Sequence, residues 1–246
     1  MKCFATIIIF VLATATATEL PSTFKICKRS EPKYLDCLGE AVTEAVVSLA
    51  GGLKSFRILP IEPLAVESIK IGEAQGAVNL KQEYKNIKLY GLTKGLNVTN
   101  YRIDFEKWTL RSDAYNPQVD FVADYKINGR ILVLPVRGSG KSNITMYNLK
   151  TETDMFGETY EKDGETYLKV KKYVARFNPE HVTMKFENLF DGDTLLGEQM
   201  NRFINENSDL VFKEVQSSYE ETFGLVFKKI ANDIFSRVPI SKIFPE

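Results

Sequence analysis

The chain has little of what metal, redox and nucleophilic chemistry requires. Its 246 residues include a single histidine, His181, and three cysteines. A multi-histidine metal centre is therefore excluded, and a serine triad would depend on His181 alone. The sequence also has no G-x-S-x-G nucleophile elbow. We expect no catalysis, no metal and no cofactor; the enzymatic alternative is a lipid-transforming esterase that uses His181.

The chain also lacks an excess of charge of either sign. Its 32 basic residues balance 32 acidic ones, without a long run of either. Nucleic-acid-binding proteins carry a basic patch, and polybasic segments attract proteins to anionic membranes. We therefore expect neither nucleic acid nor a charged membrane surface as a partner.

A phosphate-binding loop is missing as well, although residues 138–142 (GSGKS) resemble part of one. The full pattern requires glycine five positions before Gly140, where Pro135 stands. A helix should follow such a loop, whereas residues 143–147 are typical of a strand. We interpret residues 138–142 as a flexible turn between two strands.

The N-terminus has the pattern of a secretory signal peptide. A basic start at Lys2 precedes an apolar run over residues 4–13, and Ala15-Thr16-Ala17 fits the small-x-small cleavage site. The prediction is a signal peptide of residues 1–17 and a secreted mature domain of residues 18–246. No later stretch approaches the roughly 20 apolar residues of a membrane-spanning helix, so we expect no stable membrane insertion.

The predicted secretion determines which cysteines remain and whether they form a disulfide. Cys3 leaves with the signal peptide, so Cys27 and Cys37 are the remaining pair in an oxidising compartment. We expect a disulfide between them, worth about 2–3 kcal/mol by the loop-entropy argument. The alternative is a pair of free thiols.

Residues 194–238 carry the strongest pattern in the chain, an apolar stripe at helical spacing. Asp193 or Thr194 is the expected N-cap, and Pro239 the stop. One continuous helix would be about 60 Å long. Because most steps are four residues, the stripe drifts around the helix and needs cover on more than one side. A helix hairpin, a bent coiled coil and a helix wrapped by a curved sheet all meet that need.

A second, shorter helix is predicted over residues 35–49, where apolar side chains recur at i, i+3, i+4 and i+7. The pair Gly51-Gly52 would end it.

Between about residues 68 and 190 the apolar period changes to two, which is typical of strands. The alternation is clearest over residues 119–127. Asn128-Gly129 predicts a type I′ hairpin turn, and Lys162-Asp163-Gly164 a second turn. Strands followed by a helix indicate an α+β fold with an antiparallel sheet.

Two glycosylation sequons lie in or beside these strands. Asn97-Val98-Thr99 and Asn143-Ile144-Thr145 would carry glycans in a secreted protein if their asparagines face water.

A long amphipathic helix against a curved sheet can enclose an apolar tunnel, as a lipophilic ligand requires. The alternative is that the same side chains simply fill the interior. Our candidates for the tunnel wall serve equally well as core, and they come from both predicted helices: Leu38, Val42, Val46, Phe203, Val211, Val215 and Tyr219.

Several segments follow one another in a recognisable order: Cys27 with Cys37, and residues 59–64 (LPIEPL), 121–125 (FVADY), 129–140 (GRILVLPVRGSG), 161–169 (EKDGETYLK), 186–193 (FENLFDGD), 201–207 (NRFINEN), 238–239 (VP) and 244–245 (FP). Together they resemble the insect takeout proteins, within the superfamily that includes the juvenile hormone-binding proteins.

The resemblance implies a long C-terminal helix wrapped by a highly curved antiparallel sheet, with a hydrophobic tunnel between them. It also implies a secreted carrier of a small hydrophobic ligand such as a juvenile hormone-like terpenoid, a fatty acid or another long-chain lipid. Family roles include circadian output, feeding and chemosensation, and an unidentified receptor is a further candidate partner. The second disulfide of many juvenile hormone-binding proteins has no counterpart here, which favours the takeout branch. The alternative function is a secreted interaction or signalling protein with a filled core.

Overall fold

The computed structural model describes residues 19–71 and 77–246, so the predicted signal peptide lies outside the described residues. The elements follow one another as α1 (Tyr34–Ser48), η1 (Leu49–Gly51), η2 (Lys54–Phe56), β1 (Leu64–Ile71), β2 (Val78–Tyr90), β3 (Asn97–Asp104), β4 (Thr109–Ile131), β5 (Leu134–Lys162), β6 (Glu165–Asn178), β7 (His181–Phe186), η3 (Phe190–Gly192), α2 (Thr194–Glu206), α3 (Ser208–Phe235) and α4 (Ile240–Ile243).

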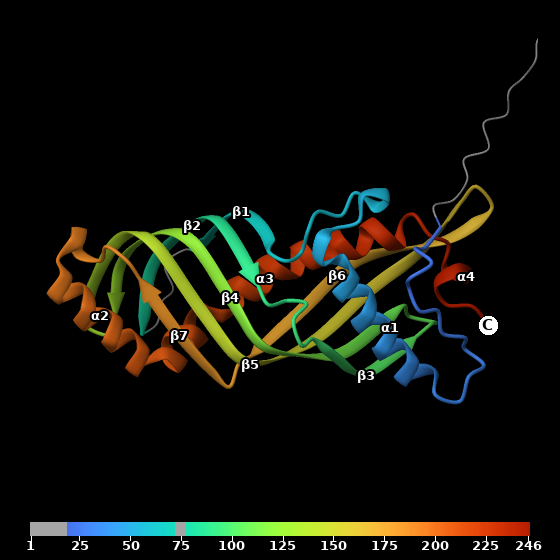
Figure 1. Cartoon of the computed structure of the whole chain (residues 1–246), viewed down its shortest axis with the longest axis horizontal. Coiled ribbons are helices and arrows are strands. Elements are labelled where there is room, and N and C mark those ends of the chain that lie inside the picture. Colours follow the sequence, from blue (N-terminus) through green and yellow to red (C-terminus); the bar gives the residue numbers. More distant parts are fainter. Residues whose placement is uncertain (1–18, 72–76) are drawn as a thin grey trace, which may run out of the picture.

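The strands form one antiparallel sheet in the order β1-β2-β4-β5-β6, in which β3 also pairs with β4 and β7 with β5. The two longest strands, β4 and β5, run through both halves of the molecule (Figure 1). In one half they pair with β2 and β7, and in the other with β3 and β6. Two differently built halves therefore share one continuous pair of strands.

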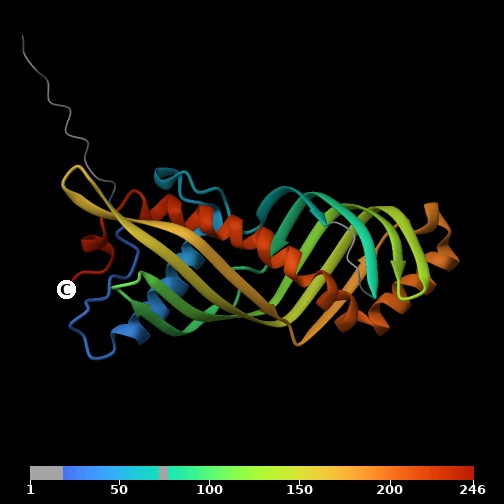
Figure 2. The same ribbon diagram turned by 180° about the vertical axis from the view of Figure 1, so that it is seen from behind.

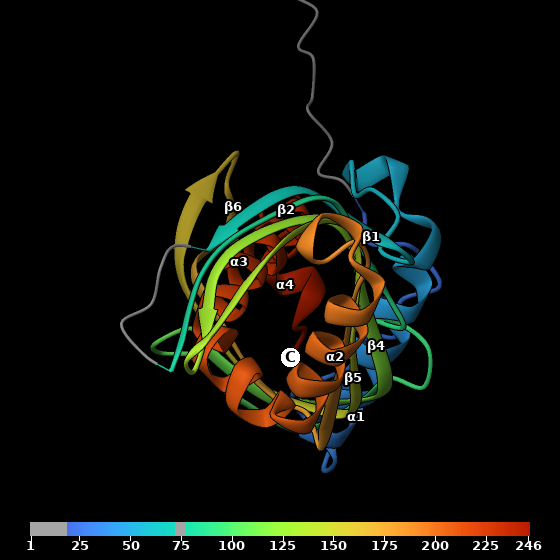
Figure 3. The same ribbon diagram turned by 90° about the vertical axis from the view of Figure 1, so that its left-hand side faces the viewer.

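The sheet curls around the long axis, and α2 and α3 lie on its concave side (Figure 3). Seen from behind, α3 runs diagonally along most of the molecule (Figure 2). The alternation predicted over residues 119–127 is confirmed, because Val119, Phe121, Ala123, Tyr125 and Ile127 are all buried. The α+β fold with a curved antiparallel sheet around a long C-terminal helix is confirmed.

The C-terminal helix is not continuous. It breaks at Asn207, whose backbone leaves the helical region (φ −120°, ψ 24°) between α2 and α3. The Nδ2 group of Asn207 donates to the carbonyl of Phe203 over 2.8 Å. Asparagine side chains compete with the backbone for such partners, which favours a helix end. Because of this break, α2 packs along β7 and α3 packs along β6.

The hairpin predicted at Asn128-Gly129 is wrong. Both residues lie inside β4, opposite Arg137 and Val136 of β5. The turn falls instead at Leu132-Val133. A Cβ atom on Gly129 (φ 150°) would lie 2.1 Å from the carbonyl oxygen of Asn79. Gly129 therefore allows β2 to approach β4 closely, and it does not form a turn.

The turn predicted at residues 138–142 is also wrong, because this segment is paired strand within β5. Its glycines make room for a crossing segment. A Cβ atom on Gly138 would lie 2.9 Å from Leu189 Cα, and one on Gly140 would lie 2.6 Å from the carbonyl oxygen of Glu187.

Other local predictions are confirmed. Helix α1 is followed by η1, after which Gly52 has the expected positive φ of 79°. Asp193 caps α2, its carboxylate accepting from the Leu196 N–H over 3.0 Å. Asp163 and Gly164, with φ of 52° and 77°, form the turn between β5 and β6.

Candidate ligand-binding cavity

The half of the molecule built from α1, β3, β6 and the C-terminal part of α3 contains a cavity of about 360 Å³. Small-molecule sites in proteins span about 300–1,000 Å³, so this volume suits a small ligand. Most of the lining side chains are aliphatic or aromatic, and they come from both helices, from the sheet and from the segment before α1.

One face of α1 forms part of the wall. The lining residues of α1 repeat at i, i+3, i+4, i+7 and i+8, which is one face of a helix, and Leu49 of η1 continues the wall: Leu38, Ala41, Val42, Ala45, Val46 and Leu49. The three α1 candidates named from the sequence, Leu38, Val42 and Val46, therefore lie on the wall of the cavity.

The four candidates from the C-terminal stretch lie in three different places. Tyr219 lines the main cavity. Val211 and Val215 line a second, smaller cavity of about 20 Å³, to which Tyr219 also contributes. Phe203 on α2 is half-buried against the core and belongs to neither wall.

The wall also includes residues that sequence reasoning missed. On α3 these include Phe223, Ile230 and Ile234, which belong to the apolar stripe of the sequence, together with Phe212 and Phe227. The sheet adds inward-facing residues that alternation alone cannot assign to either half: Phe121, Ile144, Met146 and Phe177. The segment before α1 contributes Leu20 and Phe24, which belong to no periodic apolar pattern in the sequence.

An aromatic cluster lies where the two cavities adjoin. The Tyr219 ring lies 5.5 Å from that of Phe121 at an interplanar angle of 80°, and 6.2 Å from that of Tyr84. Phe212 stacks on Tyr219 at 6.5 Å. Edge-to-face and offset contacts of this kind are favourable ring geometries. Tyr219 thus stands at the inner end of the main cavity.

Polar groups are few and mostly neutral on this wall. The Asn116 Nδ2 group is already engaged, donating to the carbonyls of Gly91 and Leu92 over 3.1 Å each. Burial raises the pKa of Tyr101 and of Tyr173, so both phenols stay neutral at physiological pH. Apart from Lys25, whose ammonium group is paired with Glu40, the wall is apolar or neutral, and such a wall suits an uncharged, largely apolar ligand.

The segment that covers one side of the cavity is fastened to α1 twice. A disulfide joins Cys27 to Cys37 of α1. Two residues earlier, Lys25, which also lines the cavity, forms an ion pair with Glu40. The disulfide fixes the end of the segment next to the wall.

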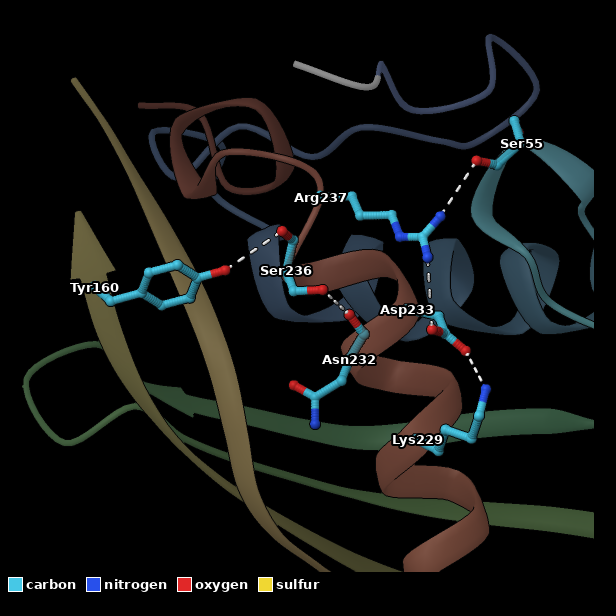
Figure 4. Close-up of polar contacts among 7 residues, drawn as sticks. All are labelled: Ser55, Tyr160, Lys229, Asn232, Asp233, Ser236 and Arg237. Carbon is cyan, nitrogen blue, oxygen red and sulfur yellow. Dashed lines mark hydrogen bonds and ion pairs between the residues drawn. The ribbon is translucent and has the colours of Figure 1, made fainter. Parts of the chain in front are cut away.

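Polar contacts hold the C-terminal end of α3 (Figure 4). The Tyr160 hydroxyl donates to the Ser236 carbonyl over 3.3 Å, and an Arg237 N–H donates to the Ser55 carbonyl over 3.5 Å. Asp233 pairs with Lys229 at 2.8 Å and with Arg237 at 3.9 Å. These contacts connect the last turn of α3 to the β5–β6 hairpin and to η2.

Other kinds of site find no support within the described part of the chain. No group of three or more His, Cys, Asp or Glu side chains there is placed to hold a metal ion. His181 is exposed on β7, its ring stacked on that of Tyr147 at 6.0 Å. None of the described helices is long and apolar enough to cross a membrane.

The sequon residues Asn97 and Asn143 are both exposed.

Comparison with known families agrees with this architecture. The family model for the haemolymph juvenile hormone binding proteins (JHBP) matches residues 6–245. The chain belongs to this family. It is a member of the takeout and juvenile hormone-binding superfamily, as the resemblance predicted.

Individual relatives are distant in sequence. The chain is 23% identical over 233 residues to the circadian clock-controlled protein daywake of Drosophila melanogaster, covering 91% of this chain and 88% of the relative. Daywake of Drosophila yakuba is 24% identical over 235 residues, with the same coverage. The crystal structure of Epiphyas postvittana Takeout 1 superposes with a TM-score of 0.79 at 23% identity, covering 90% of this chain and all of that one. The fold is therefore that of Takeout 1.

Proposed function

We propose that the protein is a secreted carrier that binds a small lipophilic ligand in the main cavity. The observation that carries the proposal is the apolar cavity of about 360 Å³ between α1, α3 and the sheet. Membership in a family described by hormone binding supports the same function. The ligand class we propose is a terpenoid, a fatty acid or another long-chain lipid.

Burial of apolar surface supplies the affinity. Each methylene moved from water into an apolar site gains about 0.8 kcal/mol. A tail of about ten carbons would gain roughly 8 kcal/mol, which leaves affinity near the micromolar range once the costs of binding are subtracted. The cavity thus offers binding energy mainly through its shape and its apolar wall.

The alternatives have less support. A secreted interaction protein with a filled core would not need a cavity of about 360 Å³. An esterase would have to use His181, which lies on β7 and is not among the cavity's lining residues. We therefore favour the carrier.

Secretion and glycosylation are part of the proposal. The candidate glycan sites, Asn97 and Asn143, are exposed, as glycosylation requires. The relatives named as circadian clock-controlled proteins make circadian output one candidate setting, beside feeding and chemosensation. Treatment of the secreted protein with an N-glycosidase should increase its gel mobility.

The experiment that tests the carrier function is native mass spectrometry of the secreted protein, followed by organic extraction of whatever is released on unfolding. A stoichiometric lipid mass is the expected result, and it would give the ligand's chemical class. A protein that releases no lipid and takes up no apolar fluorescent probe would contradict the proposal.

A pair of variants on α1 connects binding to this cavity. Ala45 lines the wall, so Ala45→Trp should fill part of the cavity and weaken probe binding at least about tenfold, since a packed site tolerates little extra volume. Val47 is 43% exposed and is not a lining residue, so Val47→Trp is the matched control. Equal binding by both variants would place the ligand elsewhere.

A further inference from the structure

The hydroxyl of Tyr219 is a buried polar group without a hydrogen-bond partner. Tyr219 is 5% exposed, and among the described residues nothing bonds to its Oη atom. Buried polar atoms in folded proteins are nearly always paired, so an unpaired one calls for an explanation. Tyr219 also lines both cavities, so this residue lies where the two cavities adjoin.

A second unpartnered donor lies in the same region. The side chain of Gln82 is buried, and its Nε2 group has no partner in the described part of the chain. Its Oε1 atom accepts from the Tyr84 hydroxyl over 2.8 Å, which fixes the orientation of the amide. The Tyr84 hydroxyl, which donates to Gln82, lies beside that of Tyr219 and could still accept from it, but the contact between the two phenols does not reach ordinary hydrogen-bond geometry.

These groups belong to the smaller cavity. Gln82, Tyr84 and Tyr219 line it, and its other described lining residues are apolar. Its volume of about 20 Å³ is enough for one small group. Tyr219 and Ile144 are shared with the main cavity, so the polar groups adjoin its inner end.

The charge of the smaller cavity restricts what can enter. None of its described lining side chains is charged. A carboxylate buried there would lose its hydration without gaining a cation, which is far more costly than burying a neutral oxygen. Both unpartnered groups can donate a hydrogen bond. The site therefore matches a neutral oxygen that accepts hydrogen bonds.

We propose that the ligand carries an uncharged oxygen acceptor, such as a ketone, ester or aldehyde carbonyl, at the end that enters deepest. The Tyr219 hydroxyl and the Gln82 Nε2 group donate to this oxygen, and the apolar tail lies in the main cavity towards α1. This inference rests on the proposed carrier function and adds the ligand's polar group and its orientation.

The test compares three probe ligands of one chain length and nearly one shape: a methyl ketone, the 2-methyl-1-alkene that replaces its oxygen by a methylene group, and the carboxylate. Dissociation constants come from displacement of an apolar fluorescent probe. The ratio of alkene to ketone constants is compared between proteins, so that the ligands' different solubilities in water cancel.

Tyr219→Phe removes one donor and leaves the ring. We expect alkene binding to stay unchanged while the ketone loses roughly three- to tenfold in affinity, the usual effect of one hydrogen bond. Tyr101→Phe is the matched control, because it removes a hydroxyl from β3 on the same main cavity. The ratio in this control should equal that of the wild type. The carboxylate should not respond to Tyr219→Phe.

The outcomes separate the two proposals. If all three ligands bind and Tyr219→Phe leaves the ratio unchanged, the inference is overturned and the carrier function stands. A ratio that responds to Tyr101→Phe instead would reverse the ligand's orientation and overturn the inference as well. A carboxylate that responds as the ketone does would overturn the claim that the group is uncharged. If the probe binds but none of the ligands displaces it, the inference alone is overturned; if the protein takes up no probe and releases no lipid, the carrier function fails and the inference fails with it.

Discussion

Asn205 of α2 closes the free edge of β7 at Met184. Its Oδ1 atom accepts from the Met184 N–H over 2.8 Å, and its Nδ2 group donates to the Met184 carbonyl over 2.7 Å. One turn earlier, Asn201 makes the same pair of bonds to Phe186, at 2.9 and 2.8 Å. Four residues along a helix advance about 6 Å, and two residues along a strand advance about 6.6 Å. The spacing of Asn201 and Asn205 on α2 therefore matches that of Phe186 and Met184 on β7. Asn232 of α3 repeats the arrangement on β6 at Val170.

Asn205→Leu should lower the free energy of unfolding by about 2–3 kcal/mol, because it leaves a part-buried N–H and carbonyl of β7 without partners. Denaturant unfolding followed by circular dichroism would measure the loss. Glu206→Leu is the control, since Glu206 is the exposed neighbour on the same helix. Because leucine forms helices at least as well as asparagine or glutamate, helix propensity cannot cause a loss, and an equal loss in both variants would mean that the bonds to the edge of β7 do not determine the effect.

These asparagines explain why the sequence predicted the long helix but not how it docks. The apolar stripe gives the helix, because periodic burial is readable from residue type. Asn201 and Asn205 appear solvent-facing in the same pattern, although they contact the sheet. Their role depends on which strand edge lies opposite, which is a tertiary property. The break at Asn207 has the same origin, since asparagine occurs both within helices and at their ends.

The two glycines of the predicted turns give a second prediction. Gly164 lies in the β5–β6 turn with φ 77°, and a Cβ atom there would meet nothing within 4 Å. Gly164→Ala should therefore cost only backbone strain, about 1–2 kcal/mol. Gly129→Ala should cost about 3 kcal/mol or more, because its Cβ atom would lie 2.1 Å from the Asn79 carbonyl oxygen. Thermal unfolding of both variants tests the order, and a larger loss for Gly164→Ala would contradict it.

The cavity wall was predictable to the extent that one helix face determines it. Leu38, Val42 and Val46 were named from the α1 stripe and lie on the wall. On the C-terminal stretch the drifting stripe could not show which turns face the cavity, so Val211 and Val215 fall on the smaller one. The inward positions of the long strands pass through both halves of the molecule. Their assignment to one cavity requires the pairing of β4 and β5.

A third prediction concerns alkaline pH. Burial raises the pKa of Tyr125 to about 12, and its hydroxyl donates to the Glu187 carbonyl over 2.6 Å. In the unfolded chain a tyrosine loses its proton near pH 10. Between about pH 10 and 12 the unfolded state therefore binds fewer protons than the folded state, and the free energy of unfolding falls as the pH rises. This contribution is complete below about pH 10 and is lost as the pH rises through the folded pKa.

Denaturant titrations at about pH 8, 10 and 11 would measure this decline. Burial also raises the pKa of Tyr84, Tyr101 and Tyr173, which adds to the decline in the same direction. Tyr125→Phe should make the decline shallower, whereas Tyr90→Phe, at a residue 38% exposed, should leave it unchanged. A decline equally steep in wild type and Tyr125→Phe would show that Tyr125 does not contribute.

The disulfide connects the stability of the fold to retention of the proposed ligand. Cys27 and Cys37 are separated by 10 residues, and the bond joins the covering segment of residues 20–26 to α1. Replacing both cysteines by alanine should lower the free energy of unfolding by about 2–3 kcal/mol through the entropy of the opened loop. It should also speed release of a bound apolar probe, because this part of the wall then has a looser attachment. Reductant should reproduce both effects in the wild type and change neither quantity in the double variant. Probe release at the wild-type rate in the double variant would mean that the segment holds its place through packing and the Lys25–Glu40 ion pair alone.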